Sequence, residues 1–145
     1  MRIWLCPLAF FIVCTGVGAQ DDLPAARKVL TGHKEAITCL EFSPDGNTLA
    51  TGSKDGDARL WDTATWKTRV TLPGHKDMVT TVAFSPDSAL VATGSHDPEI
   101  KLWNAANGKE TCVLKGHRNE VRGLAFLSDA ALASASADYS MKTWI

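Results

Sequence analysis

The sequence lacks three features on which common functions depend: an excess of one charge, clustered cysteines and a long uninterrupted apolar run. Its 15 Lys and Arg against 16 Asp and Glu leave a net charge of −1, without the basic field that nucleic acid or an anionic membrane would need. The four cysteines form no CxxC or CxxCH motif, which argues against the usual zinc, thioredoxin-like and c-type haem sites. We expect no cofactor, no metal and no nucleic-acid partner.

The N-terminal residues have the order of a secretory signal peptide. A basic residue, the apolar run 3–14 and small residues ending at Ala19 follow one another. This order predicts a signal helix over 1–19, a linker over 20–26, and export to the periplasm or the outside. A retained anchor is the alternative, but the apolar run is shorter than the ~20 residues that span a bilayer. After cleavage we expect no membrane attachment.

The rest of the chain repeats with a period of 42 residues, and a repeat must be recognised before any other fold assignment. Laying 32–73 over 74–115 without a gap gives 18 identities in 42 positions. A third, weaker copy covers 116–145. The spacing from the tryptophan of the second copy to that of the third is one residue shorter than the spacing from the first to the second. The repeated motifs are Gly-His at 32, 74 and 116, Phe-Ser-Pro-Asp at 42 and 84, Ala-Thr-Gly-Ser at 50 and 92, and Leu-Trp at 60 and 102.

Each repeat predicts a meander of four short antiparallel strands. In the first copy, alternating apolar residues and turn residues place these strands at 37–42, 47–53, 58–61 and 69–72. The segment 27–30 matches the fourth strand. We therefore expect the repeat region to open with a fourth-type strand and to end with a third-type strand, an offset that suits closure of a ring.

These motifs at this period resemble the WD-repeat β-propeller family, whose units run about 40–45 residues with four strands per blade. The resemblance covers 27–145. It implies an all-β fold, a partial propeller of three four-stranded antiparallel blades.

In that family a histidine, a Ser or Thr, an aspartate and a tryptophan of each repeat form a hydrogen-bonded structural set, which we call the tetrad. The resemblance places three tetrads in this chain. They are His33, Thr51, Asp55 and Trp61; His75, Thr93, Asp97 and Trp103; and His117, Ser134, Asp138 and Trp144.

The same residue types also occur in hydrolase triads, so catalysis is the competing interpretation. A catalytic triad occurs once and needs an exposed nucleophile with an oxyanion hole, whereas this set recurs three times at a fixed period. The histidines likewise have no second ligand at metal-binding spacing. We therefore predict no enzyme activity and no catalytic or metal-binding residue.

The resemblance implies a scaffold that binds proteins on the rim where loops of the blades meet. The family's contact positions correspond here to Ala36, Thr38 and Lys54; Met78, Thr80 and His96; and Glu120, Arg122 and Ala137. Lys54, Met78, Thr80, His96, Glu120 and Arg122 are the candidate partner contacts. The identity of the protein partner is not readable from them.

Three further residues depart from the repeat or need a separate prediction. Cys39 and Cys112 fall on different strands of different repeats, so we expect two buried, unpaired thiols rather than a disulfide. Trp66 stands where the second copy has Gly108, and we interpret it as a packing residue rather than part of a contact patch.

Closure of the ring leaves two explanations open, because closed propellers have about 4–8 blades. The chain is a fragment of a longer propeller, which we favour, or two chains associate into a six-bladed ring.

Two functions also stay open. The first is an exported, non-catalytic protein-interaction scaffold. The second is an extracytoplasmic propeller enzyme or small-ligand binder whose site lies in other blades.

Overall fold

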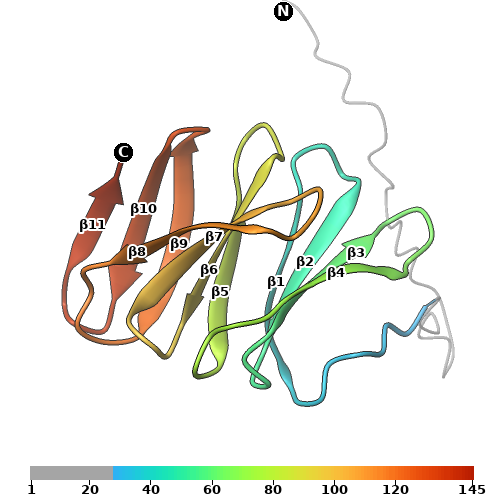
Figure 1. The fold of residues 1–145 in the computed structure, drawn as a ribbon, viewed down its shortest axis with the longest axis horizontal. Helices are drawn as coiled ribbons and strands as arrows, with labels where there is room; N and C mark the ends of the chain where they lie inside the picture. The colour runs from blue at the N-terminus through green and yellow to red at the C-terminus, as the bar shows by residue number, and fades with distance from the viewer. Residues whose placement is uncertain (1–27) are drawn as a thin grey trace, which may run out of the picture.

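A computed structural model describes residues 28–145, which form three antiparallel β-sheets standing side by side (Figure 1). We call these sheets blade 1, blade 2 and blade 3. Blade 1 contains β1 (Ile37–Phe42), β2 (Thr48–Ser53), β3 (Ala58–Asp62) and β4 (Thr68–Leu72). Blade 2 contains β5 (Val79–Phe84), β6 (Leu90–Ser95), β7 (Glu99–Asn104) and β8 (Glu110–Lys115). Blade 3 contains β9 (Val121–Ser128), β10 (Ala131–Ser136) and β11 (Met141–Trp144).

The strands of each blade pair in the order in which they follow along the chain, as expected of a meander. Turn chemistry fixes the connections. Gly46 adopts a φ of 73° in the Ser-Pro-Asp-Gly turn between β1 and β2, a left-handed conformation that glycine reaches without strain. Ser88 takes the same region in blade 2, with a φ of 63°. Trp66, half-buried, has a φ of 58° where Gly108 has 70°, so the irregular residue occupies a position that favours glycine.

The core consists of two interfaces between neighbouring blades. One buries apolar side chains of blades 1 and 2 against each other, and the other does the same for blades 2 and 3. Blade 2 therefore has both faces covered, while blades 1 and 3 each have one face without a neighbouring blade among the described residues. The first interface contains Leu60, Leu72, Val79, Val82 and Phe84; the second contains Ile100, Leu114, Val121, Leu124 and Phe126.

Glycine is required where adjacent blades approach most closely. A Cβ added at Gly94 would lie 2.8 Å from both Thr81 Cγ2 and Val121 Cγ1, and one at Gly52 would lie 2.6 Å from Val79 Cγ1. Real Cβ atoms do not approach so closely, so β2 and β6 pack against the next blade only because these side chains are absent.

The structure corrects three details of the expected architecture. Blade 3 has three strands in the described residues, not four. Residues 28–30 form no strand, because a fourth-type strand needs a third-type strand beside it and β11 lies at the opposite end of the arc (Figure 1). The Cys112 thiol is exposed, not buried, because β8 is an outer strand, while Cys39 is partly buried; both are unpaired.

The predicted signal helix over 1–19 and the linker over 20–26 lie outside the described residues.

Candidate functional site

The four side chains of each predicted tetrad meet in one hydrogen-bonded chain that crosses the blade. In blade 2, the indole Nε1 of Trp103 donates to Thr93 Oγ1 at 2.9 Å. His75 joins Thr93 to Asp97, with Nε2 2.8 Å from Thr93 Oγ1 and Nδ1 3.0 Å from Asp97 Oδ2.

The direction of these bonds follows from donor chemistry. An indole N–H only donates, so the Thr93 oxygen accepts from Trp103 and its own proton is free to go to His75 Nε2. A carboxylate only accepts, so His75 Nδ1 carries the proton that bonds Asp97. One neutral imidazole with its proton on Nδ1 satisfies every member of the tetrad.

Blades 1 and 3 repeat this geometry. In blade 1, Thr51 Oγ1 lies 2.8 Å from both His33 Nε2 and Trp61 Nε1. His33 Nδ1 is 3.1 Å from Asp55 Oδ2. In blade 3, His117 Nε2 is 2.7 Å from Ser134 Oγ, His117 Nδ1 is 2.9 Å from Asp138 Oδ2, and Trp144 Nε1 is 2.9 Å from Ser134 Oγ.

The three aspartates also accept backbone N–H groups, which ties the turn after the second strand to the loop that carries the histidine. Lys34, Lys76 and Arg118 each donate an N–H to Asp55, Asp97 and Asp138 respectively, at 2.8–3.0 Å. Burial alone would raise the pKa of Asp55, but its bonds from Lys34, Asp57 and His33 outweigh burial and hold the pKa at about 2.

The carboxyls of Asp97 and Asp138 have lowered pKa values as well. Burial opposes the shift at Asp97, where the Lys76 N–H and His75 overcome it. The Ser140 hydroxyl, followed by the Arg118 N–H, lowers the pKa of Asp138. All three carboxylates are therefore held ionised as acceptors.

This arrangement does not supply a nucleophile. The Thr93 hydroxyl is buried, donates to one tetrad member and accepts from another, so it has neither access to a substrate nor a free position. Thr51 and Ser134 are in the same state.

The predicted contact positions lie together at the end of the strands where the second strand turns into the third. Backbone bonds join them in pairs: Lys54 N–H to the Ala36 carbonyl, His96 N–H to Met78, and Ala137 N–H to Glu120. We call this end of the blades the rim.

Two of these positions form hydrogen bonds to the next blade. The hydroxyl of Thr38 donates to the Val79 carbonyl of blade 2, and the hydroxyl of Thr80 donates to the Val121 carbonyl of blade 3. Both threonines therefore join neighbouring blades. Both threonines occupy the same repeat position, and each bonds a residue 41 positions later. The hydrogen bond itself can be recognised only when the neighbouring blades are placed side by side.

Three other positions meet in a charged cluster that joins blades 2 and 3. Glu120 accepts from His96 Nε2 and from the Arg122 guanidinium, while Asp77 lies 4.0 Å from His96 Nδ1. His96 and Arg122 remain substantially exposed. We call His96, Glu120 and Arg122 the rim cluster. Lys54 is exposed but apart from it, and Met78 is half-buried.

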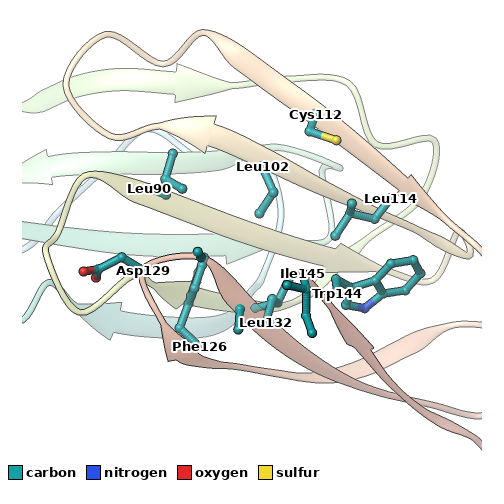
Figure 2. A pocket seen from close by; sticks show the side chains of 11 residues that line it. Leu90, Leu102, Cys112, Leu114, Phe126, Asp129, Leu132, Trp144 and Ile145 are labelled. Carbon is teal, nitrogen blue, oxygen red and sulfur yellow. The ribbon is translucent and has the colours of Figure 1, made fainter.

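An apolar cavity of about 260 Å³ opens between blades 2 and 3 (Figure 2). Leu90, Leu102 and Leu114 of blade 2 point into it from one side, and Phe126 and Trp144 of blade 3 from the other (Figure 2). Its ionisable lining is limited to Asp129 and the Cys112 thiol. It contains no base positioned against a nucleophile.

Within 28–145, no group of three or more His, Cys, Asp or Glu side chains is arranged to hold a metal ion. A search of the same part of the chain found no helix with the length and apolarity to cross a membrane.

The fold and the repeated tetrads are those of a WD-repeat protein, and comparison with known families agrees. The model of the WD domain, G-beta repeat matches residues 25–62, 66–104 and 108–144, so the chain belongs to this family. The second and third matches begin just before β4 and β8, and the three matches end at β3, β7 and β11, so the family's repeat has the offset seen in the sequence.

Individual relatives match one repeat. The Notchless protein homolog of Arabidopsis thaliana is 53% identical over 38 residues, which are 26% of this chain and 8% of that protein. The human serine-threonine kinase receptor-associated protein is 54% identical over 37 residues, 26% of this chain and 11% of that protein. The matched part of the chain thus spans about a tenth of these relatives.

A solved structure matches most of the described fold. The RRP9 WD40 repeats superpose with a TM-score of 0.78 at 32% identity, covering 81% of this chain and 37% of that one. The blades are therefore arranged as they are in part of a solved WD40 structure.

The relatives contradict the predicted export. The Notchless homolog, the receptor-associated protein and RRP9 are intracellular proteins, nuclear or cytoplasmic. The prediction was wrong because a basic residue, an apolar run and small residues form a compositional pattern that does not by itself establish translocation.

Proposed function

We propose that this chain is a non-catalytic protein-interaction scaffold that presents its rim to protein partners. One observation carries the proposal: the side chains that resemble catalytic groups satisfy one another inside the blades, whereas the rim cluster is left accessible. The tetrad side chains bond one another inside each blade, and the exposed side chains of the rim are the ones that a partner can reach.

The rim cluster has the properties of a contact surface. The Arg122 guanidinium keeps further N–H donors in an exposed position, and the His96 imidazole lies exposed beside it. Arg is among the residues enriched at protein interfaces. Glu120 is mostly covered and holds both side chains in place. An exposed guanidinium suits an acidic or carbonyl-rich surface on a partner.

The relatives support the same function at the level of their names. The receptor-associated protein is, by its name, a protein that associates with another protein.

The test is capture of proteins by the immobilised full chain, with matched variants. We expect His96→Ala with Arg122→Ala to weaken binding of a captured partner at least tenfold. Lys67→Ala with Lys109→Ala, which removes exposed side chains at the opposite ends of the strands, should leave binding unchanged. Equal binding by the rim variant, or loss of binding only in the Lys67 and Lys109 variant, would refute the rim as the contact surface.

A further inference from the structure

The two open ends of the arc carry the unpaired halves of the interface that joins its blades. On β1, the side chains Ile37, Leu40 and Phe42 are 49%, 62% and 50% exposed. They stand one period before Val79, Val82 and Phe84, which blade 1 buries in the first interface. The open face of blade 1 is therefore apolar in the same places as a face that another blade covers.

The outer face of blade 3 is the other half. Ala133 and Met141 correspond to Ala92 and Ile100, which are fully buried against blade 3, whereas Met141 is 77% exposed. A shallow apolar hollow of about 240 Å³ lies here, lined by Gly123, Ala125, Ala133, Ala135 and Met141 among others. The blade 1 face offers protruding side chains, and the blade 3 face offers a hollow.

Backbone hydrogen bonding shows the same complementarity. β3 and β7 each pair with a fourth strand, but within 28–145 the outer edge of β11 pairs with none. Residues 28–30 match the fourth strands in sequence, yet they are unpaired and Val29 is 74% exposed. Within 28–145, an unpaired strand edge and an unpaired segment that matches the fourth strands therefore lie at opposite ends of the arc (Figure 1).

We propose that a second copy of this chain covers both ends, so that two arcs close into one six-bladed ring. In each of the two contacts, the segment 28–30 of one copy pairs with β11 of the other. The loop after a fourth strand leads directly into the first strand of the next blade, as β4 leads into β5. When the segment 28–30 of one copy pairs with β11 of the second copy, the open face of blade 1 in the first copy therefore packs on the open face of blade 3 in the second. The contact continues the interface that already joins blades 1, 2 and 3.

The repeat also fixes the register of the new strand pair. In blade 1, Thr71 of β4 faces Arg59 of β3, and in blade 2 Val113 faces Lys101. The residues at the matching positions are Lys142 on the open edge of β11 and Val29 in the free segment 28–30. Facing residues in an antiparallel pair have Cα atoms about 4.5–5.5 Å apart, within the range that a disulfide bridges.

One position distinguishes the new contact from the internal ones. Ala135 stands where β2 and β6 have Gly52 and Gly94, so Ile37 of the second copy would meet a methyl group that Val79 and Val121 do not. Blade 3 also has less bulk beside this methyl group, because Gly123 stands where blades 1 and 2 have Cys39 and Thr81. The side chains of Cys39 and Thr81 lie close to Gly52 and Gly94. The ring contact is therefore looser than the internal interfaces, but it is not blocked.

The first test is the molar mass of the full chain in solution at micromolar concentration. A closed ring predicts twice the 15.6 kDa of one chain. Leu40→Asp and Met141→Asp, on the two sides of the contact, should each give the single-chain mass with an unchanged β-sheet circular dichroism spectrum. Ala106→Asp, which adds the same charge to an exposed loop of blade 2, should keep the doubled mass.

A second test does not depend on how these variants fold. We expect a mixture of the Val29→Cys chain and the Lys142→Cys chain to form a disulfide-linked pair under mild oxidation, at least tenfold more than either chain alone. A single-chain mass for the unmodified protein, open polymers larger than two copies, or no mixture-specific link would each overturn the ring. None of these outcomes bears on partner binding at the rim.

Discussion

Blades 1 and 2 show the same sequence pattern with and without a neighbour. Val79, Val82 and Phe84 of blade 2 are 0%, 5% and 4% exposed because blade 1 covers them. Their counterparts Ile37, Leu40 and Phe42 of blade 1 are about half exposed. The difference shows that burial in a stacked fold is set by the next unit rather than by the residue's own strand, as expected when each repeat contacts only its neighbours.

The largest effect should come from truncating an apolar side chain that is buried in blade 2 but exposed at the matching position of blade 1. Phe84→Ala leaves a cavity between blades 1 and 2, and we expect it to lower the free energy of unfolding by about 3–5 kcal/mol. Chemical denaturation measures this. In a Leu40→Asp background, which keeps the blade 1 face uncovered, Phe42→Ala should cost about 1 kcal/mol. Equal losses for the two phenylalanines would mean that the faces are equivalent in solution.

A tetrad variant tests what holds a single blade together. Asp97→Ala removes the acceptor of His75 and of the Lys76 and Glu99 N–H groups, so we expect a loss of about 2–3 kcal/mol. The exposed Asp77→Ala serves as the control and should change stability by less than about 1 kcal/mol. The melting temperature of both variants is the measurement. An unchanged value for Asp97→Ala would show that the tetrad does not stabilise the blade.

The glycine positions sharpen the comparison of internal and open faces. Gly94→Ala places a methyl group against Val121 and Thr81 and should cost about 1–3 kcal/mol. Ala135→Gly makes the reverse change on the open face and should cost only about 0.5–1 kcal/mol, because a strand glycine loses backbone entropy. Urea unfolding of both variants checks this order. A larger loss for Ala135→Gly would contradict the packing described for β6.

Acid should weaken all three blades. The folded-state pKa of Asp55 is about 2, below the ~3.9 of an unfolded aspartate, and the pKa values of Asp97 and Asp138 are also lowered. Groups with depressed pKa values add stability above pH 4 and lose it as the pH falls toward 2. The melting temperature should therefore drop between pH 4 and pH 2. A constant melting temperature over this interval would contradict the carboxylate bonds.

Much of the fold could be predicted because the same strand and turn motifs recur in each repeat. The expected strands of blade 1 agree with β1 to β4 to within one residue at each end. The family assignment followed from the Gly-His, Phe-Ser-Pro-Asp and Leu-Trp motifs and is confirmed by the family match. Period and turn chemistry are local signals, and local signals are readable in a sequence.

What depends on neighbours could not be predicted. Thr80 was predicted as a partner contact, and the sequence did not indicate that its hydroxyl and that of Thr38 bond backbone carbonyls of the next blade. Cys112 was expected to be buried, yet nothing among the described residues covers that face of β8 fully. Segment 28–30 matched a strand but has no edge to pair with in its own arc. Each of these outcomes is decided by which surfaces meet.

The central claim is that the histidine of each blade is a fixed link in a closed polar chain. Long-range ¹H–¹⁵N spectra at pH 8 report which imidazole nitrogen carries the proton. The account predicts that His33, His75 and His117 each hold it on Nδ1, donated to the aspartate. Nε2-protonated rings at these three positions would contradict it.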